Sequence, residues 1–152
     1  MEQSERDRLA DALLEASRAL LAVAVRSISA GTAKVTVVQH RVLVLLDAHQ
    51  LLSVNAVADE LGIDQSNASR HCTRLARLGL VTRTRATHDG RAVDVALTAA
   101  GRQQVRAVRA ARRREIVQLL ANLPDSDVRE MAHAFELFGH STGDRRTALE
   151  AI

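Results

Sequence analysis

Aromatic residues, cysteine and proline are scarce in this sequence of 152 residues. Tryptophan and tyrosine are absent and phenylalanine occurs only twice, so the core must be built from aliphatic side chains. One cysteine excludes an intramolecular disulfide, and a single proline leaves long stretches able to form helix. No apolar run reaches the roughly 20 residues that span a membrane, and the N-terminal stretch is charged, unlike a secretory signal. We therefore expect one mainly helical cytoplasmic domain without membrane association.

Charge is unevenly distributed along the chain, although its total is only +3. Twelve arginines and three acidic residues between Asp64 and Arg114 give +9, and the rest of the chain carries −6. A basic segment between acidic flanks favours contact with a polyanion such as nucleic acid. A solvated arginine-rich surface explains the same distribution, because Lys34 is the only lysine and arginine is the usual cation here. Charge alone leaves both interpretations open.

Hydrophobic periodicity predicts helices before the basic segment. The first is expected over about residues 4–29, with apolar side chains on two faces that indicate burial on two sides. A second is expected from the N-cap Thr36 to about His49. Its VLVLL run is locally ambiguous with a strand, but the helical spacing of apolar residues extends beyond it.

A short helix, a glycine turn and a polar helix follow in close succession. Ser53 is expected to cap the short helix, which ends at Gly62, and Asp64 is expected to cap the polar helix. This spacing predicts a helix-turn-helix. The inward stripe of the polar helix is expected to comprise Ala68, Cys72, Leu75, Ala76 and Gly79.

The other face of the polar helix carries many hydrogen-bonding side chains in its first turns. A recognition helix enters the major groove with these turns at the base edges, where Gln and Asn bond adenine, Arg bonds guanine and Ser bonds either. Its free N–H groups also favour phosphate. We therefore predict that the DNA-binding residues of this helix are Gln65, Ser66, Asn67, Ser69, Arg70, His71 and Arg74.

A β-hairpin is predicted after Gly79, because the hydrophobic period changes there to two on both sides of a polar turn at 88–90. Arginine near a hairpin tip can insert into a narrow minor groove. The residues of this wing predicted to contact DNA are Arg83, Arg85, His88, Asp89 and Arg91. Asp89 and Arg91 can instead pair across the turn, and both roles are compatible because the carboxylate can aim the guanidinium.

Two further helices are predicted beyond the wing. A long helix is expected over about residues 99–121 behind the N-cap Thr98, and a last helix from Asp125 to about His140. The RAARRRE run at 109–115 spreads its arginines around the long helix, so a solvated face partly paired with acids is slightly favoured over a phosphate-binding run. The last helix is expected to bury Val128, Met131, Ala132, Phe135 and Phe138.

From Leu61 to Arg102 the chain resembles MarR-type regulators (multiple antibiotic resistance regulators). The likeness includes RLARLGLVTR between helix and wing, DGR as an Asp-x-Arg wing tip and LTAAGR opening the next helix. Upstream, VVQHRVLVLL and SVNAVADELGI match in place, and the order of helices fits over about residues 5–140. Each motif is weak alone, but together and in this order they are specific.

This resemblance implies a mainly α fold with a small β-hairpin, a winged helix-turn-helix with N- and C-terminal dimerisation helices. It implies a single domain over residues 1–152, in which about 36–98 bind DNA and about 4–30 and 99–141 dimerise. The implied function is a homodimeric regulator, usually a repressor, of a pseudo-palindromic operator in double-stranded DNA. Many such dimers release DNA when a small acid or phenol occupies a crevice between the two regions.

Other functions remain open. A dimeric winged-helix module that binds protein would be expected to show an apolar anchor where this helix exposes Gln, Ser, Asn and Arg. A redox- or metal-responsive regulator would use Cys72 or the histidines, but Cys72 falls on the inward stripe and no two histidines stand four residues apart. No catalytic residue, metal site or cofactor is expected, because the chain lacks a phosphate-binding glycine loop and a nucleophile elbow.

Overall fold

The computed structural model describes residues 2–87 and 90–141. Its elements follow one another closely, and a short 3₁₀ turn at Ile28–Ala30 ends the first helix. In chain order they are α1 (Glu2–Ser27), α2 (Val37–His49), β1 (Leu51–Ser53), α3 (Val54–Leu61), α4 (Gln65–Arg77), β2 (Val81–Arg85), β3 (Val93–Leu97), α5 (Ala99–Leu120) and α6 (Asp125–Ser141).

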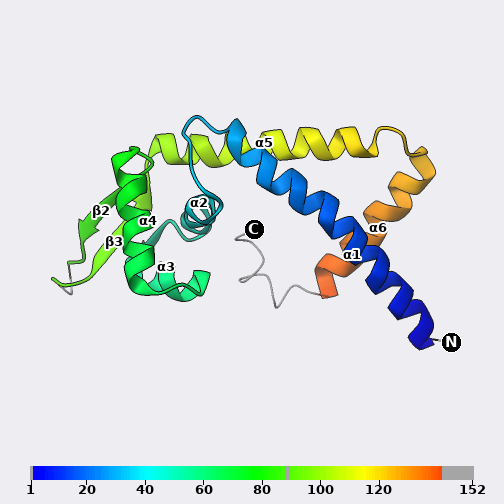
Figure 1. Ribbon diagram of the computed structural model, residues 1–152, viewed down its shortest axis with the longest axis horizontal. Helices are drawn as coiled ribbons and strands as arrows, with labels where there is room; N and C mark the ends of the chain where they lie inside the picture. Colours follow the sequence, from blue (N-terminus) through cyan, green and yellow to red (C-terminus); the bar gives the residue numbers. More distant parts are fainter. Residues whose placement is uncertain (1, 88–89, 142–152) are drawn as a thin grey trace.

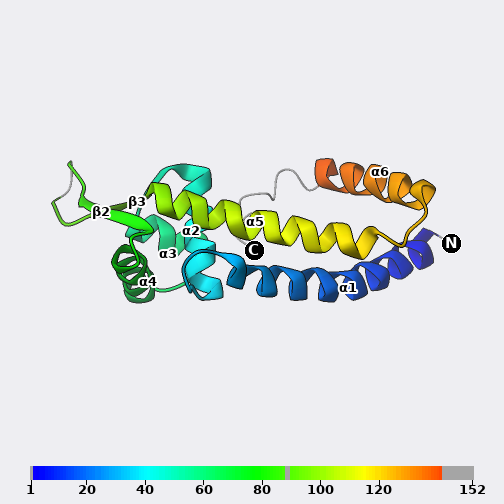
Figure 2. The same ribbon diagram turned by 90° about the horizontal axis from the view of Figure 1, so that it is seen from above.

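The molecule is elongated, with a compact head at one end (Figure 1). The head contains α2, α3, α4 and the sheet, and the long helix α5 runs from it to α6 at the far end. Helix α1 packs along α5, and the view from above shows the two side by side (Figure 2). The predicted winged helix-turn-helix with flanking helices is confirmed.

Local capping explains why the predicted helix starts are confirmed. The Thr36 side chain accepts a hydrogen bond from the Gln39 backbone, and the Gln39 side chain accepts one from the Thr36 N–H, which completes a capping box. The Ser53 side chain caps α3, and the Thr98 side chain caps α5. Gly62 ends α3 in the left-handed conformation that favours glycine.

The sheet has three strands instead of the two predicted. Strand β1 pairs with β3, which also pairs with β2, and both pairings are antiparallel. The sequence prediction missed β1 because this strand has only three residues and depends on pairing Leu52 with Val95, far away in the chain. This third strand ties the wing to the helix-turn-helix.

The aliphatic core lies inside the head. Leu43, Leu46 and Leu75 are fully buried there, and Val57 and Val95 close it from α3 and the sheet. No helix among the described residues is long and apolar enough to cross a membrane.

A buried glutamine joins α5 to the loop between α1 and α2. The Gln104 amide oxygen accepts hydrogen bonds from Thr32 Oγ1 at 3.1 Å and the Ala33 N–H at 2.9 Å, and its Nε2 donates to the Ala33 carbonyl at 2.9 Å. Gly31 packs so closely that an added Cβ would lie 2.1 Å from Gln104 Nε2. The start of α5 and the entrance to the head are thereby fixed to each other.

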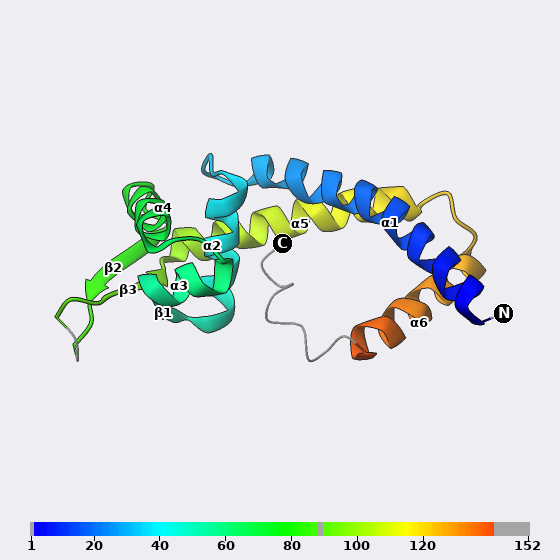
Figure 3. The ribbon, with the colours of Figure 1, turned by 60° about the horizontal axis from the view of Figure 1, so that its bottom comes forward.

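The prediction that α6 buries its apolar side chains is wrong for the single chain. No residue of α6 is buried, and Phe135 and Phe138 are about half exposed. Figure 3 shows that the chain turns back after the far end of α5 and that α6 lies apart from the head. The periodicity correctly marked an apolar face, but a face can be covered only by an element that reaches it.

Candidate nucleic-acid interface

The predicted recognition helix is α4, which lies on the outer side of the head beside the wing (Figure 1). Ala68, Cys72 and Leu75 of its inward stripe are fully buried, Ala76 is half-buried and Gly79 is exposed. On the other face, the predicted DNA-binding residues of α4 are exposed at Gln65, Ser66, Arg70 and Arg74, and half-buried at Asn67, Ser69 and His71. The helix therefore divides into a docking face and a polar face.

Asp64 occupies the N-cap position of α4, but the predicted capping bond is not formed. Its carboxylate accepts hydrogen bonds from Ser66 Oγ at 2.9 Å and Asn67 Nδ2 at 2.5 Å instead of from a backbone N–H. These two donors satisfy the hydrogen-bonding capacity of the carboxylate. The hydrogen bond from Ser66 is the main reason that the pKa of Asp64 is lowered.

A chain of hydrogen bonds continues from Asp64 along the polar face. The Asn67 amide donates to Asp64, and its oxygen accepts from the Arg70 guanidinium. Asparagine can donate and accept at once, so this residue holds the arginine in a defined direction. The network restricts side chains that would otherwise lose rotamer freedom on binding.

The wing is formed by β2 and β3, and its two predicted arginines on β2 lie on the same face but differ in burial. Arg85 is exposed, whereas Arg83 is half-buried and donates from Nη1 to Thr73 Oγ1 of α4 at 2.5 Å. Alternate residues of a strand share a face, and buried Val81 lies on this face as well. Arg91 is exposed, and His88 and Asp89 lie outside the described residues.

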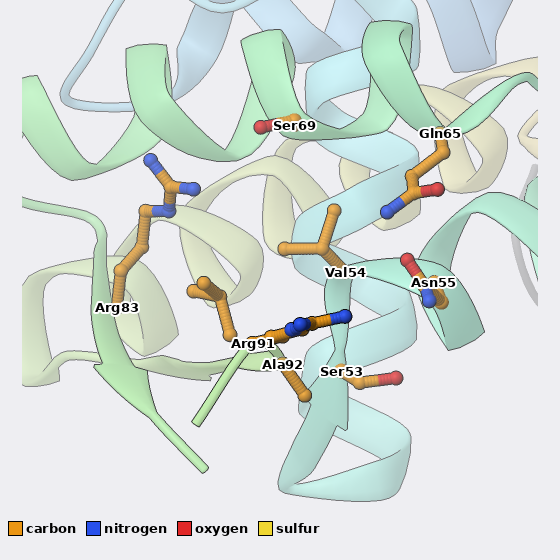
Figure 4. Close-up of a pocket in the computed structure, with 9 residues that line it drawn as sticks. Ser53, Val54, Asn55, Gln65, Ser69, Arg83, Arg91 and Ala92 are labelled. Atoms are coloured by element: carbon orange, nitrogen blue, oxygen red, sulfur yellow. The ribbon is translucent and has the colours of Figure 1, made fainter. Parts of the chain in front are cut away.

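A polar hollow of about 380 Å³ lies between the start of α3, the start of α4 and the wing (Figure 4). It brings four predicted site residues together and adds two that sequence reasoning missed. Ser53 and Asn55 come from the N-terminal turn of α3, where only the capping role of Ser53 was recognised. The polar side chains that line the hollow are Ser53, Asn55, Gln65, Ser69, Arg83 and Arg91.

Cys72 is a packing residue of the head. Its side chain is fully buried in the aliphatic cluster, and burial raises the pKa of its thiol although Arg83 acts in the opposite direction. A protonated, inaccessible thiol is a poor nucleophile. Among the residues that the structure describes, no group of three or more histidine, cysteine or acidic side chains is arranged to hold a metal ion.

The arginine run on α5 partly faces α1. The sequence predicted that some arginines of this run pair with acidic residues. Arg112 instead donates to Ser27 Oγ at 3.2 Å and to the Ala24 carbonyl at 3.3 Å. Glu115, the acidic residue at the end of this run, accepts a hydrogen bond from Nε of Arg26 on α1 at 2.9 Å. These contacts hold α1 against α5.

His40 lies where α1, α2 and α5 meet. It is almost fully buried among apolar side chains, with Arg41 and Arg112 beside it, and its Nδ1 has no hydrogen-bond partner among the described residues. Burial, assisted by the charge of Arg112, lowers the pKa of His40 from 6.5 to about 4. The imidazole is therefore neutral at pH 7.

Because His40 is buried in its neutral form, we expect the free energy of unfolding to fall in acid. The unfolded chain binds a proton at His40 near pH 6.5 and the folded chain only near pH 4, so stability is full above pH 6.5 and falls as the pH drops between these values. Between pH 7 and pH 5 the free energy of unfolding should fall by about 2 kcal/mol through this residue. Urea unfolding of wild type and His40→Gln at both pH values measures the difference. Equal pH dependence in the two proteins would contradict the assignment.

The sequence of this chain is similar to those of known regulatory proteins. Residues 33–92, from the loop before α2 to the wing, match the model described as MarR family. The chain is 30% identical over 99 residues to the HTH-type transcriptional repressor MdtR of Bacillus subtilis (strain 168). That match covers 65% of this chain and spans 64% of the repressor's length.

Solved structures extend the likeness to almost the whole chain. RV1404 from Mycobacterium tuberculosis is 32% identical, with a TM-score of 0.78 over 90% of this chain and 94% of its own. A mutant of MepR from S. aureus, bound to an oligodeoxyribonucleotide, superposes with a TM-score of 0.69 at 21% identity. That match covers 88% of this chain and 96% of MepR, and at this identity it concerns the fold.

Proposed function

Because this chain belongs to the MarR family, we propose that it acts as a homodimeric transcriptional repressor that binds a pseudo-palindromic DNA duplex. The observation that carries this proposal is the exposed polar face of α4 beside an arginine-bearing wing. A partner protein would more readily bind an apolar anchor, which the described part of this face lacks. The oligonucleotide bound to MepR, a protein of the same fold, supports DNA as the ligand.

In the proposed complex, α4 lies in the major groove and the wing reaches the adjacent minor groove. Gln65 and the network of Asp64, Asn67 and Arg70 present amide and guanidinium groups to base edges. Arg74 lies further along the helix, where backbone phosphates are closer than bases. Arg85 and Arg91 approach the minor groove from the wing.

The apolar surface along α1 and α6 supports a dimer. Exposed apolar side chains gather on α1 and α6, away from the proposed DNA-binding face, and extensive patches of this kind mark interaction surfaces. A second copy would cover both helices and place two recognition helices roughly one turn of DNA apart. The large apolar side chains exposed there are Leu9, Leu14, Leu20, Leu21, Val25, Met131, Phe135, Leu137 and Phe138.

Base-edge contacts predict an altered sequence preference after substitution on α4. Gln65→Ala or Asn67→Ala should weaken the preference at one base pair in each half-site by roughly 1–3 kcal/mol. Arg91→Ala should instead weaken binding to all duplexes, and should lower the slope of log affinity against log salt by about 0.9 if it loses one phosphate. Random-site selection followed by salt titration measures both effects.

The same selection separates the repressor from a protein-interaction module. A DNA-binding dimer enriches a palindrome, whereas a module that binds only protein returns none. If all three variants bind the selected operator as tightly as the wild-type protein does, α4 and the wing do not dock as proposed. Transcription from a promoter that carries this operator should rise when the gene is deleted.

A small organic acid is the proposed releasing effector. A cleft of about 540 Å³, within the range of ligand sites, lies between the C-terminal end of α1 and residues 31–37. It adjoins the loop that Gln104 fixes to α5, so a ligand there can bias how the head sits on the dimer helices. At constant ionic strength, benzoate should weaken operator binding by about tenfold, and acetate serves as the control. Equal effects of the two acids would contradict this proposal.

A further inference from the structure

In the proposed complex, a DNA strand would pass over the polar hollow between the start of α3, the start of α4 and the wing. Adjacent major and minor grooves of a duplex are separated by one sugar–phosphate strand. If α4 enters the first groove and the wing enters the second, this strand crosses between them. Figure 4 shows that the space between these elements is the hollow, edged by Gln65 on one side and Arg91 on the other.

We propose that this hollow is a seat for the backbone phosphate that separates the two grooves, and that Asn55 and Arg83 are binding residues of the seat. The inference rests on the proposed DNA-binding function and adds to it a defined contact that comes from α3. Neither Asn55 nor Ser53 belongs to the recognition helix or the wing, yet both line the same hollow.

The charges around the hollow suit an anion. Arg83 and Arg91 both line it, and none of its described lining residues is acidic. A negative group in this space is attracted by both guanidinium groups. Guanidinium groups bind phosphate oxygens through strong, charge-assisted hydrogen bonds.

Arg83 is the more constrained of the two arginines. Its Nη1 is committed to Thr73 Oγ1 at 2.5 Å, and its Nε is buried with no hydrogen-bond partner among the described residues. The bond to Thr73 holds the guanidinium between α4 and the hollow, where Figure 4 places it. The Arg83 guanidinium would therefore already be in position to donate to a phosphate in the seat. Such a phosphate would stabilise the packing of the wing against α4.

The N-terminal turn of α3 supplies neutral donors on the opposite side. Ser53 caps this helix, with its Oγ accepting from the Ala56 N–H at 3.1 Å, so its own hydroxyl proton is available to an acceptor. Asn55 is exposed in the first turn, and its amide can donate to a phosphate oxygen. The first N–H groups of a helix lack acceptors within it and favour negative charge.

Asn55→Asp tests the seat with little disturbance of the fold. The substitution keeps the size of an exposed side chain and places a negative charge at the hollow. Affinity for the operator obtained by random-site selection should fall at least about tenfold, and Asn55→Ala should lose less because it removes only a donor. The matched control is Gln103→Glu, which adds the same charge at an exposed position of α5 outside the hollow.

Single methylphosphonate linkages, which remove the charge of one phosphate, locate the contact. In wild type, neutralising one or two adjacent linkages between the contacted grooves should weaken binding. At those linkages the loss should shrink or vanish in Asn55→Asp, whereas elsewhere wild type and variant should respond alike. A response that is confined to one or two linkages and depends on residue 55 would support the proposed phosphate seat.

Two results would overturn the inference and are distinguishable from each other. If a palindrome is selected and Asn55→Asp binds it like wild type, or responds like wild type at every neutral linkage, the seat is refuted while the proposed DNA-binding function stands. If no duplex is enriched, the proposed function fails and the seat fails with it.

Discussion

Replacing Gly101 with alanine should destabilise the chain by about 3 kcal/mol, because the added methyl group would meet backbone atoms. A Cβ at this position would lie 2.1 Å from the Leu80 carbonyl oxygen and 3.1 Å from Leu97 Cδ2. Side chains can rotate away from such an overlap, but a carbonyl at the start of the wing cannot move without its strand. Urea unfolding monitored by circular dichroism measures the loss.

The close approach at Gly101 follows from how α5 begins. The Thr98 N–H donates to the Leu80 carbonyl at 3.0 Å, and Thr98 Oγ1 donates to the Gly79 carbonyl at 2.6 Å while accepting from the Gly101 N–H. The first turn of α5 is thus bonded onto the junction between α4 and β2. An alanine would force these bonds apart, so operator binding should fall together with stability.

Gly90→Ala is the matched control for Gly101→Ala. Gly90 lies at the wing, where an added Cβ meets no atom of the described residues within 4 Å and the backbone does not require glycine. Its free energy of unfolding should therefore stay within about 0.5 kcal/mol of wild type. Equal stability of the two variants would show that the contact with Leu80 is not tight.

Phe135→Asp should convert the proposed dimer into monomers and reduce operator affinity on the order of 100-fold. Phe135 lies on the apolar face of α6 and is 48% exposed in the single chain, so the substitution costs little within one subunit. In the proposed dimer it would bury a charge without a partner, which is strongly unfavourable. Loss of dimerisation lowers the affinity because a single subunit contacts only half of the operator.

Molar mass by light scattering distinguishes the two states directly. Wild type should have twice the chain mass of 16.5 kDa, and Phe135→Asp should approach the single value. Ser126→Asp adds the same charge on the face of α6 opposite to Phe135, at an exposed position, and should remain dimeric. A dimeric Phe135→Asp protein with normal operator affinity would exclude this face from the interface.

Sequence alone predicts the features of this fold that depend on near neighbours. The starts of α2 and α5 follow from Thr36 and Thr98, whose capping partners lie three residues away. The buried stripe of α4 follows from helical spacing around Cys72. These contacts are local, so their signals are present in a short stretch of chain.

Features that depend on distant partners escaped the sequence prediction. Strand β1 exists because β3 pairs with it, and Asn55 joins the candidate site only because α3 folds beside the wing. Gln104 is fully buried by a loop some seventy residues away, as its bond to Ala33 shows. Arg83 is half-buried because it reaches Thr73 of α4, a contact that the spacing along β2 does not reveal, since Arg85 lies on the same face and is exposed.

Helix α5 is also a lever arm. Its 22 residues span about 33 Å, and its first turn is bonded to the junction between α4 and β2 while its last turn leads to α6. Tilting such a rod by about 5° around its far end displaces the head by about 3 Å, close to the rise of one base pair. In the proposed dimer, the angle of α5 would therefore set, to within a single base-pair step, the spacing between half-sites that the two heads can reach together.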